Sequence, residues 1–201
     1  MKNSVFNPSQ QQKSLSGKIV ASFERISEVF KVLLWEKAKL SGLSPIQIQL
    51  LIFIAYHGPE LCNVSHLAKE FNVTKPTISD AIKILTHKAL IEKFPSVSDS
   101  RSYTIGLTEA GKTIVNETAG FTQPLEKQIE KLSITEQTTL FSQLSSIIFE
   151  LQQNQILSVQ RTCYGCRYFS QQNEQPFCKL LNSPLAQQDI RIDCPEFEAS
   201  A

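Results

Sequence analysis

Apolar residues return every three or four positions through three long stretches of the chain. In residues 18–41 this spacing places them on one side of a helix, and it predicts a long amphipathic helix. Two further helices are expected later in the chain, one capped by Thr108 and kinked at Pro124, and one that begins at Thr135. The apolar positions of the three helices are Ile19, Phe23, Ile26, Phe30, Leu33 and Leu34, then Ile114, Val115, Phe121, Leu125, Ile129 and Leu132, then Leu140, Leu144, Ile147, Ile148 and Leu151. The predicted fold class is mainly α.

A shorter segment between Ser44 and Gly58 is apolar nearly all round. Ser44 followed three residues later by Gln47 is typical of a capping box, so a helix is expected to begin here. Gly58 and Pro59 end it. A helix without a polar face has to be covered on every side. We therefore expect this helix to lie at the centre of the core.

Residues 63–89 have the pattern of two short helices joined by a tight turn at Asn72 and Val73. In the second helix Thr74 is a good N-cap and Pro76 fits the first turn, where a missing N–H costs nothing. The buried face is formed by Ile78, Ile82 and Leu85, and the opposite face by Lys75, Pro76, Thr77, Ser79, Asp80, Lys83 and His87. Such a face is often only solvated, but its small donors and cations also suit contacts with phosphates and base edges.

After Ala89 the apolar period changes from helical to alternating. Tyr103, Ile105 and Leu107 fall on one side of a returning strand, and a polar tip with Asp99 and Arg101 precedes them. Two helices followed by a two-stranded hairpin form a winged helix-turn-helix, and an arginine at the tip can enter a minor groove. The candidate DNA-binding residues are Thr74, Lys75, Pro76, Thr77, Ser79, Asp80, Lys83, Asp99 and Arg101.

Residues 18–155 resemble the MarR family of bacterial transcription regulators. The stretches that carry the resemblance are VSHLAKEFNVTKPTISDAIKILTHKALIEK, the wing tip from Asp99 to Arg101, and LTEAGK. The resemblance implies a winged-helix domain over residues 17–157, with a DNA-binding lobe at 61–112 and dimerisation helices at 18–41 and 113–157. It also implies double-stranded DNA and a second copy of the chain as partners. Ala89 stands where the family usually has glycine, and the tip has one arginine where the family often has two.

A small-molecule effector is a further implication of the resemblance. Relatives in the family often bind phenolic or lipophilic ligands between the dimer helices and the DNA-binding lobe. Phe30, Trp35, Phe53 and Tyr56 are the aromatic residues that could line such a crevice. Aromatic residues at helical spacing are, however, more often part of a core.

Residues 158–201 form a cysteine-rich segment that the family resemblance does not explain. It holds Cys163, Cys166, Cys178 and Cys194, which are four of the five cysteines in the chain. Disulfides would suit a secreted protein, but the sequence shows no export signal. A segment this short, with few apolar residues, needs a cross-link or a bound metal in order to fold. A four-thiolate metal site accounts for both the clustering and the composition.

The spacing of the cysteines leaves the kind of metal open. Zinc ribbons generally use two Cys-x2-Cys pairs, and this segment has one. Single cysteines after that pair, the last followed by Pro195, resemble an iron–sulfur site such as [4Fe–4S] more closely. The prediction leans to the cluster, and a structural Zn²⁺ is the alternative. The fifth cysteine, Cys62, is expected to be an inert packing residue.

Composition and charge change this picture little. The net charge of +1 gives no global attraction to nucleic acid, so DNA affinity must come from local placement of cations. Residues 1–16 are expected to be a flexible tail, and no stretch has the length of a membrane span. A cytoplasmic location is therefore expected. No phosphate-binding glycine loop or nucleophile elbow is present, which argues against an enzyme.

The sequence thus predicts a sequence-specific DNA-binding transcription regulator that acts as a homodimer. Its four-cysteine centre would sense iron or redox conditions, because a change next to a dimer helix would alter the spacing of the two recognition helices. The alternative is a winged-helix module that binds protein and carries a structural zinc tail.

Overall fold

Helices dominate the part of the chain that the structure describes. The structure is a computed structural model, and it describes residues 4–95, 103–172 and 175–200. The helices are α1 (Pro8–Gln11), α2 (Leu15–Ser41), α3 (Pro45–Tyr56), α4 (Val64–Glu70), α5 (Lys75–His87), α6 (Glu109–Thr118), α7 (Gln123–Ile129) and α8 (Ile134–Gln153). The strands are β1 (Ile91–Pro95), β2 (Tyr103–Leu107), β3 (Phe169–Gln172), β4 (Gln175–Cys178) and β5 (Ser183–Pro184). Short 3-10 turns are η1 (Pro59–Leu61), η2 (Ala119–Thr122), η3 (Cys163–Gly165) and η4 (Gln187–Asp189).

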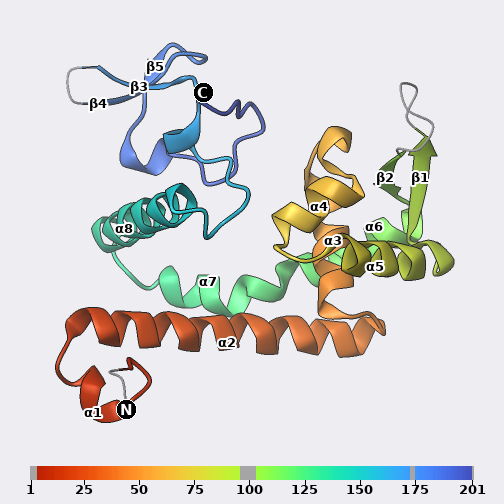
Figure 1. Cartoon of the computed structure of the whole chain (residues 1–201), viewed down its shortest axis with the longest axis horizontal. Helices are drawn as coiled ribbons and strands as arrows, with labels where there is room; N and C mark the ends of the chain where they lie inside the picture. Colours follow the sequence, from red (N-terminus) through yellow and green to blue (C-terminus); the bar gives the residue numbers. More distant parts are fainter. Residues whose placement is uncertain (1–3, 96–102, 173–174, 201) are drawn as a thin grey trace.

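The elements form a winged-helix lobe, a group of long helices and a C-terminal tail. In the view of Figure 1, α2 runs along one edge, and the lobe of α3 to α6 with the β1–β2 wing lies at one end of it. Helix α7 lies beside α2, and α8 lies on the other side of α7. The tail, residues 158–200, is next to α8 on the side away from α2, and it faces the lobe across from α4.

The core is built around α3, as the all-round apolar pattern predicts. Ile48, Leu50 and Leu51 of this helix have no exposed surface, and the helix contacts α2, α5, α6 and β2. The predicted capping box forms, because the Ser44 backbone N–H donates to Gln47 Oε1 over 2.9 Å. Among the described residues no single helix is long and apolar enough to cross a membrane, although α2 and α3 meet that test together as a pair bent by 91°.

The described part of the N-terminal segment contains a short helix. The sequence predicts a flexible tail over residues 1–16, but α1 lies within it and α2 already begins at Leu15. The reason is local capping: Asn7 Oδ1 accepts from the Ser9 N–H over 3.0 Å, and Ser14 Oγ accepts from the Gly17 N–H over 3.2 Å.

Two predicted helix boundaries beyond the wing are wrong in detail. Thr108 caps α6 as expected, since its Oγ1 accepts from the Gly111 N–H over 3.1 Å. The break that follows lies at η2, where Gly120 has non-helical φ and ψ, while Pro124 sits in the first turn of α7. Helix α8 begins at Ile134 because Ser133, not Thr135, is its cap, and the Ser133 N–H donates to Glu136 Oε2 over 2.9 Å.

Candidate functional site

Helix α5 presents a polar face that is fixed by its buried side. Ile78, Ala81, Ile82 and Leu85 are buried against the lobe. Thr74 is the N-cap, and its Oγ1 accepts from the Thr77 N–H over 3.3 Å. The helix ends in a Schellman motif, in which the Leu90 N–H donates to Leu85 O over 3.0 Å and the residue between the cap and Leu90 is left-handed.

The predicted DNA-binding residues of this helix all lie on its solvent side. They are exposed and come from the N-cap and the first turns of the helix. They are Thr74, Lys75, Pro76, Thr77, Ser79, Asp80 and Lys83. The remaining two predicted residues, Asp99 and Arg101, lie outside the described residues.

The wing is attached firmly to the lobe. Strands β1 and β2 pair antiparallel from Ile91 opposite Leu107 to Pro95 opposite Tyr103. The Ile105 N–H also donates to Cys62 O over 2.9 Å, which joins the hairpin to the segment before α4. Lys93, which the sequence reasoning did not single out, is exposed on β1 with its ammonium 4.6 Å from the centre of the Tyr103 ring. Its place on β1, paired with Ile105 of β2, could not be read from the sequence.

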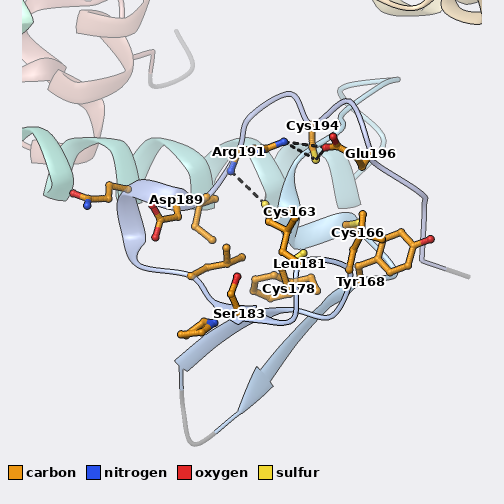
Figure 2. Close-up of a pocket in the computed structure, with 16 residues that line it drawn as sticks. Cys163, Cys166, Tyr168, Cys178, Leu181, Ser183, Asp189, Arg191, Cys194 and Glu196 are labelled. Carbon is orange, nitrogen blue, oxygen red and sulfur yellow. Dashed lines mark hydrogen bonds and ion pairs between the residues drawn. The ribbon is translucent and has the colours of Figure 1, made fainter.

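The four tail cysteines line one cavity of about 400 Å³. Figure 2 shows Cys163, Cys166, Cys178 and Cys194 around it, and all four are free thiols. The other lining residues are mostly apolar and include Leu180, Leu181, Leu185 and Ile190. Among the described residues, no three His, Cys, Asp or Glu side chains stand close enough together to hold one metal ion. The structure thus gathers the predicted ligands around a common space without bringing them to a single point.

Arg191 stands over two of these thiols (Figure 2). Its backbone N–H donates to Cys163 Sγ over 3.3 Å, and its guanidinium lies 3.7 Å from Cys194 Sγ and 2.9 Å from Glu196 Oε2. The Cys194 thiol itself donates to Glu196 over 3.4 Å. Burial is the main reason that the pKa of Cys194 is raised. N–H donors aimed at sulfur are the kind of contact that stabilises a thiolate bound to a metal.

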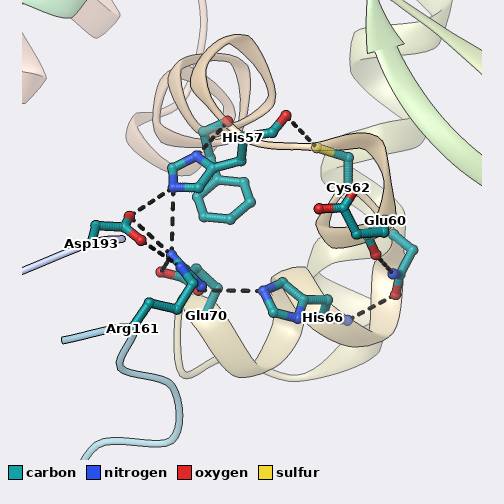
Figure 3. A network of polar contacts seen from close by, with 9 residues as sticks. His57, Glu60, Cys62, His66, Glu70, Arg161 and Asp193 are labelled. Carbon is teal, nitrogen blue, oxygen red and sulfur yellow. Dashed lines mark hydrogen bonds and ion pairs between the residues drawn. The ribbon is translucent and has the colours of Figure 1, made fainter. Parts of the chain in front are cut away.

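A network of polar side chains connects the tail to the lobe (Figure 3). Arg161 lies at its centre with a side chain only 10% exposed, and its guanidinium donates to Glu70 Oε2 over 2.8 Å and to Glu70 Oε1 over 3.2 Å. The same guanidinium donates to both carboxylate oxygens of Asp193, and Asp193 Oδ2 lies 2.7 Å from His57 Nε2. The His57 ring in turn stacks on Phe53 with centroids 3.7 Å apart.

The charges in this network support one another. Burial alone would lower the pKa of Arg161, but its hydrogen bonds to Asp193 and Glu70 outweigh burial and raise that pKa. Burial would likewise raise the pKa of Asp193, but Arg161 and His57 hold it below its ordinary value. The sequence reasoning missed this network because its members are up to 136 residues apart. The one available signal was that Arg161 and Asp193 flank Cys163 and Cys194.

Cys62 has the environment of a packing residue. Its side chain is 1% exposed, and burial followed by the charge of Glu60 raises its pKa to about 11. A thiol with such a pKa is protonated near neutral pH and therefore unreactive. The aromatic residues proposed for an effector crevice are scattered: Phe53 is buried in the core, Phe30 lies edge-on to Phe121, and Trp35 and Tyr56 are exposed.

The lobe that these elements form is a winged helix-turn-helix, and comparison with known proteins gives its relatives. Residues 41–102 match the model of the MarR family. The DNA complex of MepR from S. aureus is 25% identical, covers 65% of this chain and 96% of the MepR chain, and has a TM-score of 0.57. MepR in a DNA-binding conformation is 24% identical, covers 66% of this chain and 98% of the MepR chain, and has a TM-score of 0.59. FabT from Streptococcus pneumoniae in complex with DNA is 24% identical, covers 67% of this chain and 98% of the FabT chain, and has a TM-score of 0.54. No curated protein sequence matches the chain.

These comparisons establish the fold and delimit what they cover. The family match extends from the end of α2 through α5 and into the wing, so it includes the whole helix-turn-helix. The chain therefore has a MarR-like winged-helix fold, as the sequence resemblance implies. The cysteine-rich tail lies outside the matched segment.

Proposed function

We propose that the protein is a sequence-specific DNA-binding transcription regulator. The observation that carries the proposal is the exposed face of α5, where Lys75, Ser79 and Lys83 stand beside one another on a capped helix backed by a packed lobe. Small donors and cations on such a helix are suited to base edges and phosphates in a major groove. The DNA complexes of MepR and FabT, which share the fold, support this function. The regulator would meet its DNA in the cytoplasm.

The working form is proposed to be a homodimer. Helices α2 and α8 leave apolar side chains of their repeating stripes exposed, which a second copy of the chain would cover. These are Ile19, Phe23, Ile26 and Phe30 on α2 and Leu140, Ile147 and Leu151 on α8. Replacement of Ile26 by Glu is expected to give a monomer in sedimentation experiments and to weaken DNA binding, whereas Lys31→Glu on the same helix should leave the dimer intact. A dimeric Ile26→Glu protein would exclude this interface.

The tail is proposed to hold a metal centre on the thiolates of Cys163, Cys166, Cys178 and Cys194. A zinc ribbon generally uses two Cys-x2-Cys pairs, whereas this segment has one pair followed by two single cysteines, so an iron–sulfur centre such as [4Fe–4S] is favoured over Zn²⁺. Either centre would bind in the cavity that the four cysteines line. Gain or loss of the centre would then change DNA binding in response to iron or oxidants. A small-molecule effector stays a prediction from the family resemblance.

The metal is tested on protein purified without oxygen. Brown protein with stoichiometric iron and sulfide would support the cluster. A colourless protein with one zinc per chain would make the tail a structural staple and remove iron sensing from the proposal. Protein free of both metals would exclude the metal centre.

DNA binding is tested by fluorescence anisotropy on a duplex selected from random sequences. If Lys75, Lys83 and Arg101 each contact a phosphate, a dimer makes about six such contacts, and the slope of log K against log salt should be about −5. Replacing the three by Ala is expected to abolish specific binding. The matched control replaces Arg25, Lys127 and Lys131, which are exposed outside the lobe. Equal affinity in both variants would remove these residues from the interface.

The alternative function is a winged-helix module that binds protein and carries a structural zinc. It predicts no duplex enrichment in the selection and no steep dependence of retention on salt, because no counterions are released. The two functions are therefore separated by the same experiment.

A further inference from the structure

The tail is joined to the lobe through a single polar connection. Within the described residues, every hydrogen bond and ion pair between residues 158–200 and the segment from α3 to β2 involves Arg161 or Asp193. A cavity of about 820 Å³ lies beside this connection, with Tyr56 and Glu60 on the lobe side and Phe197 on the tail side. Among the hydrogen bonds and ion pairs of the described residues, this polar connection is therefore the one direct link between tail and lobe.

The same two residues belong to the frame of the cysteine pocket. Arg161 and Asp193 form a parallel β-bridge, and the Cys194 N–H donates to Arg161 O over 3.0 Å. Cys163 lies two residues after Arg161, and Cys194 follows Asp193 directly. Anything that draws Cys163 and Cys194 together or lets them separate must therefore change how Arg161 and Asp193 are held.

The other end of the link lies at the helix-turn-helix itself. Glu70 is the last residue of α4, and only four residues separate it from the start of the recognition helix α5. Its carboxylate accepts both guanidinium bonds from Arg161 and is 19% exposed, so the pair is partly screened from water. Figure 3 shows Arg161 reaching from the tail between Glu70 on one side and Asp193 and His57 on the other.

The tail also rests on α8. The Tyr164 ring lies 5.8 Å from that of Phe149, and η4 contacts α8. The tail thus spans from α8 to α4. A tail that contacts both helices can restrain the position of α4 and α5 relative to α8.

We propose that Arg161 and Glu70 form a clamp that couples the cysteine centre to DNA binding within one protomer. This rests on the proposed function. With the centre formed, Arg161 and Asp193 are held in register and fix α4. Without it, the clamp opens and the lobe must be ordered when DNA binds, which weakens binding.

A double-mutant cycle tests the clamp. DNA affinity is measured for the full chain by anisotropy on the selected duplex, first with intact cysteines and then with Cys163→Ser plus Cys194→Ser, which disrupts the centre whatever metal it holds. In the wild-type background the cysteine changes are expected to weaken binding at least about fivefold, the lower range of typical allosteric coupling. In the Glu70→Gln background they are expected to have less than about a twofold effect, since the link is already broken.

Two further proteins make the result specific. Glu60→Gln removes the same charge from the lobe, at a residue that lines the cavity beside the connection and has no bond to Arg161, and in that background the fivefold effect should persist. Arg161→Gln breaks the pair from the tail side and should behave as Glu70→Gln does. Thermal melts of the variants confirm that the lobe is folded.

The outcomes separate the clamp from the function on which it depends. If wild type selects no duplex, the DNA-binding function fails and the clamp fails with it. If wild type binds DNA and the cysteine changes have no effect, the function stands and the coupling is wrong. If the cysteine effect persists undiminished in Glu70→Gln and Arg161→Gln, coupling exists but does not pass through this pair, and the clamp is overturned.

Discussion

Ala89 is the residue at which a single substitution should stabilise the protein. It follows the C-cap of α5 with φ of 55°, in the left-handed region. The Schellman motif demands this conformation, because the Ala89 N–H donates to Thr86 O over 2.9 Å and Ala89 O accepts from Thr108 Oγ1 over 2.7 Å. The backbone therefore cannot relax without losing bonds that join α5 to the wing and α6.

The magnitude follows from the Cβ of Ala89. A left-handed alanine costs about 1–2 kcal/mol, which Ala89→Gly removes. Glycine also makes the unfolded chain more flexible, which lowers stability by about 0.4–1 kcal/mol and offsets part of that gain. Ala89 is exposed, so little burial is lost. The net expectation is about 1 kcal/mol of added stability, or a rise of about 2–4 °C in Tm for a chain of this size.

The assay is thermal and urea unfolding at one fixed protein concentration, because a dimer's stability depends on concentration. The control is Ala55→Gly, an exposed position in the last turn of α3, which should lose stability through helix propensity, by at most the about 1 kcal/mol that glycine costs in a helix interior. The two glycine substitutions should thus shift Tm in opposite directions. If Ala89→Gly lowers Tm as Ala55→Gly does, the strain assigned to Ala89 is refuted.

Three other predictions follow from single residues. Gly111→Ala would place a Cβ 2.0 Å from Leu90 O, so we expect a loss of about 1–3 kcal/mol or more in urea unfolding, while Gly17→Ala, whose Cβ meets only ordinary contacts, should not destabilise. Alkylation with iodoacetamide at pH 7.5 should leave Cys62 unmodified in the folded protein, because burial raises its pKa to about 11; rapid labelling would contradict this. Burial lowers the pKa of His66 below 6.5. The stability that neutral His66 contributes is therefore present above about pH 6.5 and is lost as the pH falls through its folded pKa. His66→Gln should make the melting temperature less dependent on pH over that range.

Local features were predictable where they depend only on residues close to one another in the sequence. The cap at Thr74, the capping box at Ser44 and the buried face of α5 depend on neighbours within a turn, and the structure confirms each of them. The family resemblance also identified Ala89 as a glycine position, and its positive φ shows why. These predictions needed no knowledge of the tertiary fold.

Boundaries were less predictable because two residues competed for one role. Pro124 could either kink a helix or begin one, and the structure uses it in the first turn of α7 while Gly120 forms the break. Ser133 and Thr135 were both possible caps, and the reciprocal bond with Glu136 favours Ser133. In both cases the sequence contained the deciding residue, but its effect depends on the conformation of the turn before it.

The candidate site also has a part that local sequence patterns predict and a part that depends on the tertiary fold. The exposed face of α5 could be predicted from helical periodicity, and the cysteine segment from its clustering, although the metal it binds stays a prediction. The pair of Arg161 and Glu70 could not be predicted, because the residues are 91 apart and meet only when the tail folds back past α8. Nothing in the local pattern around either residue indicates its partner.

The break in the helix at Gly120 is a point about which the lobe could rotate, and the tail adds a second link across it. Apart from the tail, the lobe is joined to α2 through the α2–α3 turn and through Leu34 and Ala38, which are buried in its core, and it continues into α7 through η2, where the helical backbone is interrupted. A connection of this kind allows a lobe to rotate about a few residues. The tail adds a link on another side of the lobe, because Tyr164 contacts Phe149 of α8 and Arg161 contacts Glu70 at the end of α4. Rotation of the lobe about η2 would have to break the contact between Arg161 and Glu70, so under the proposed clamp whatever orders residues 158–200 also restrains the orientation of α5.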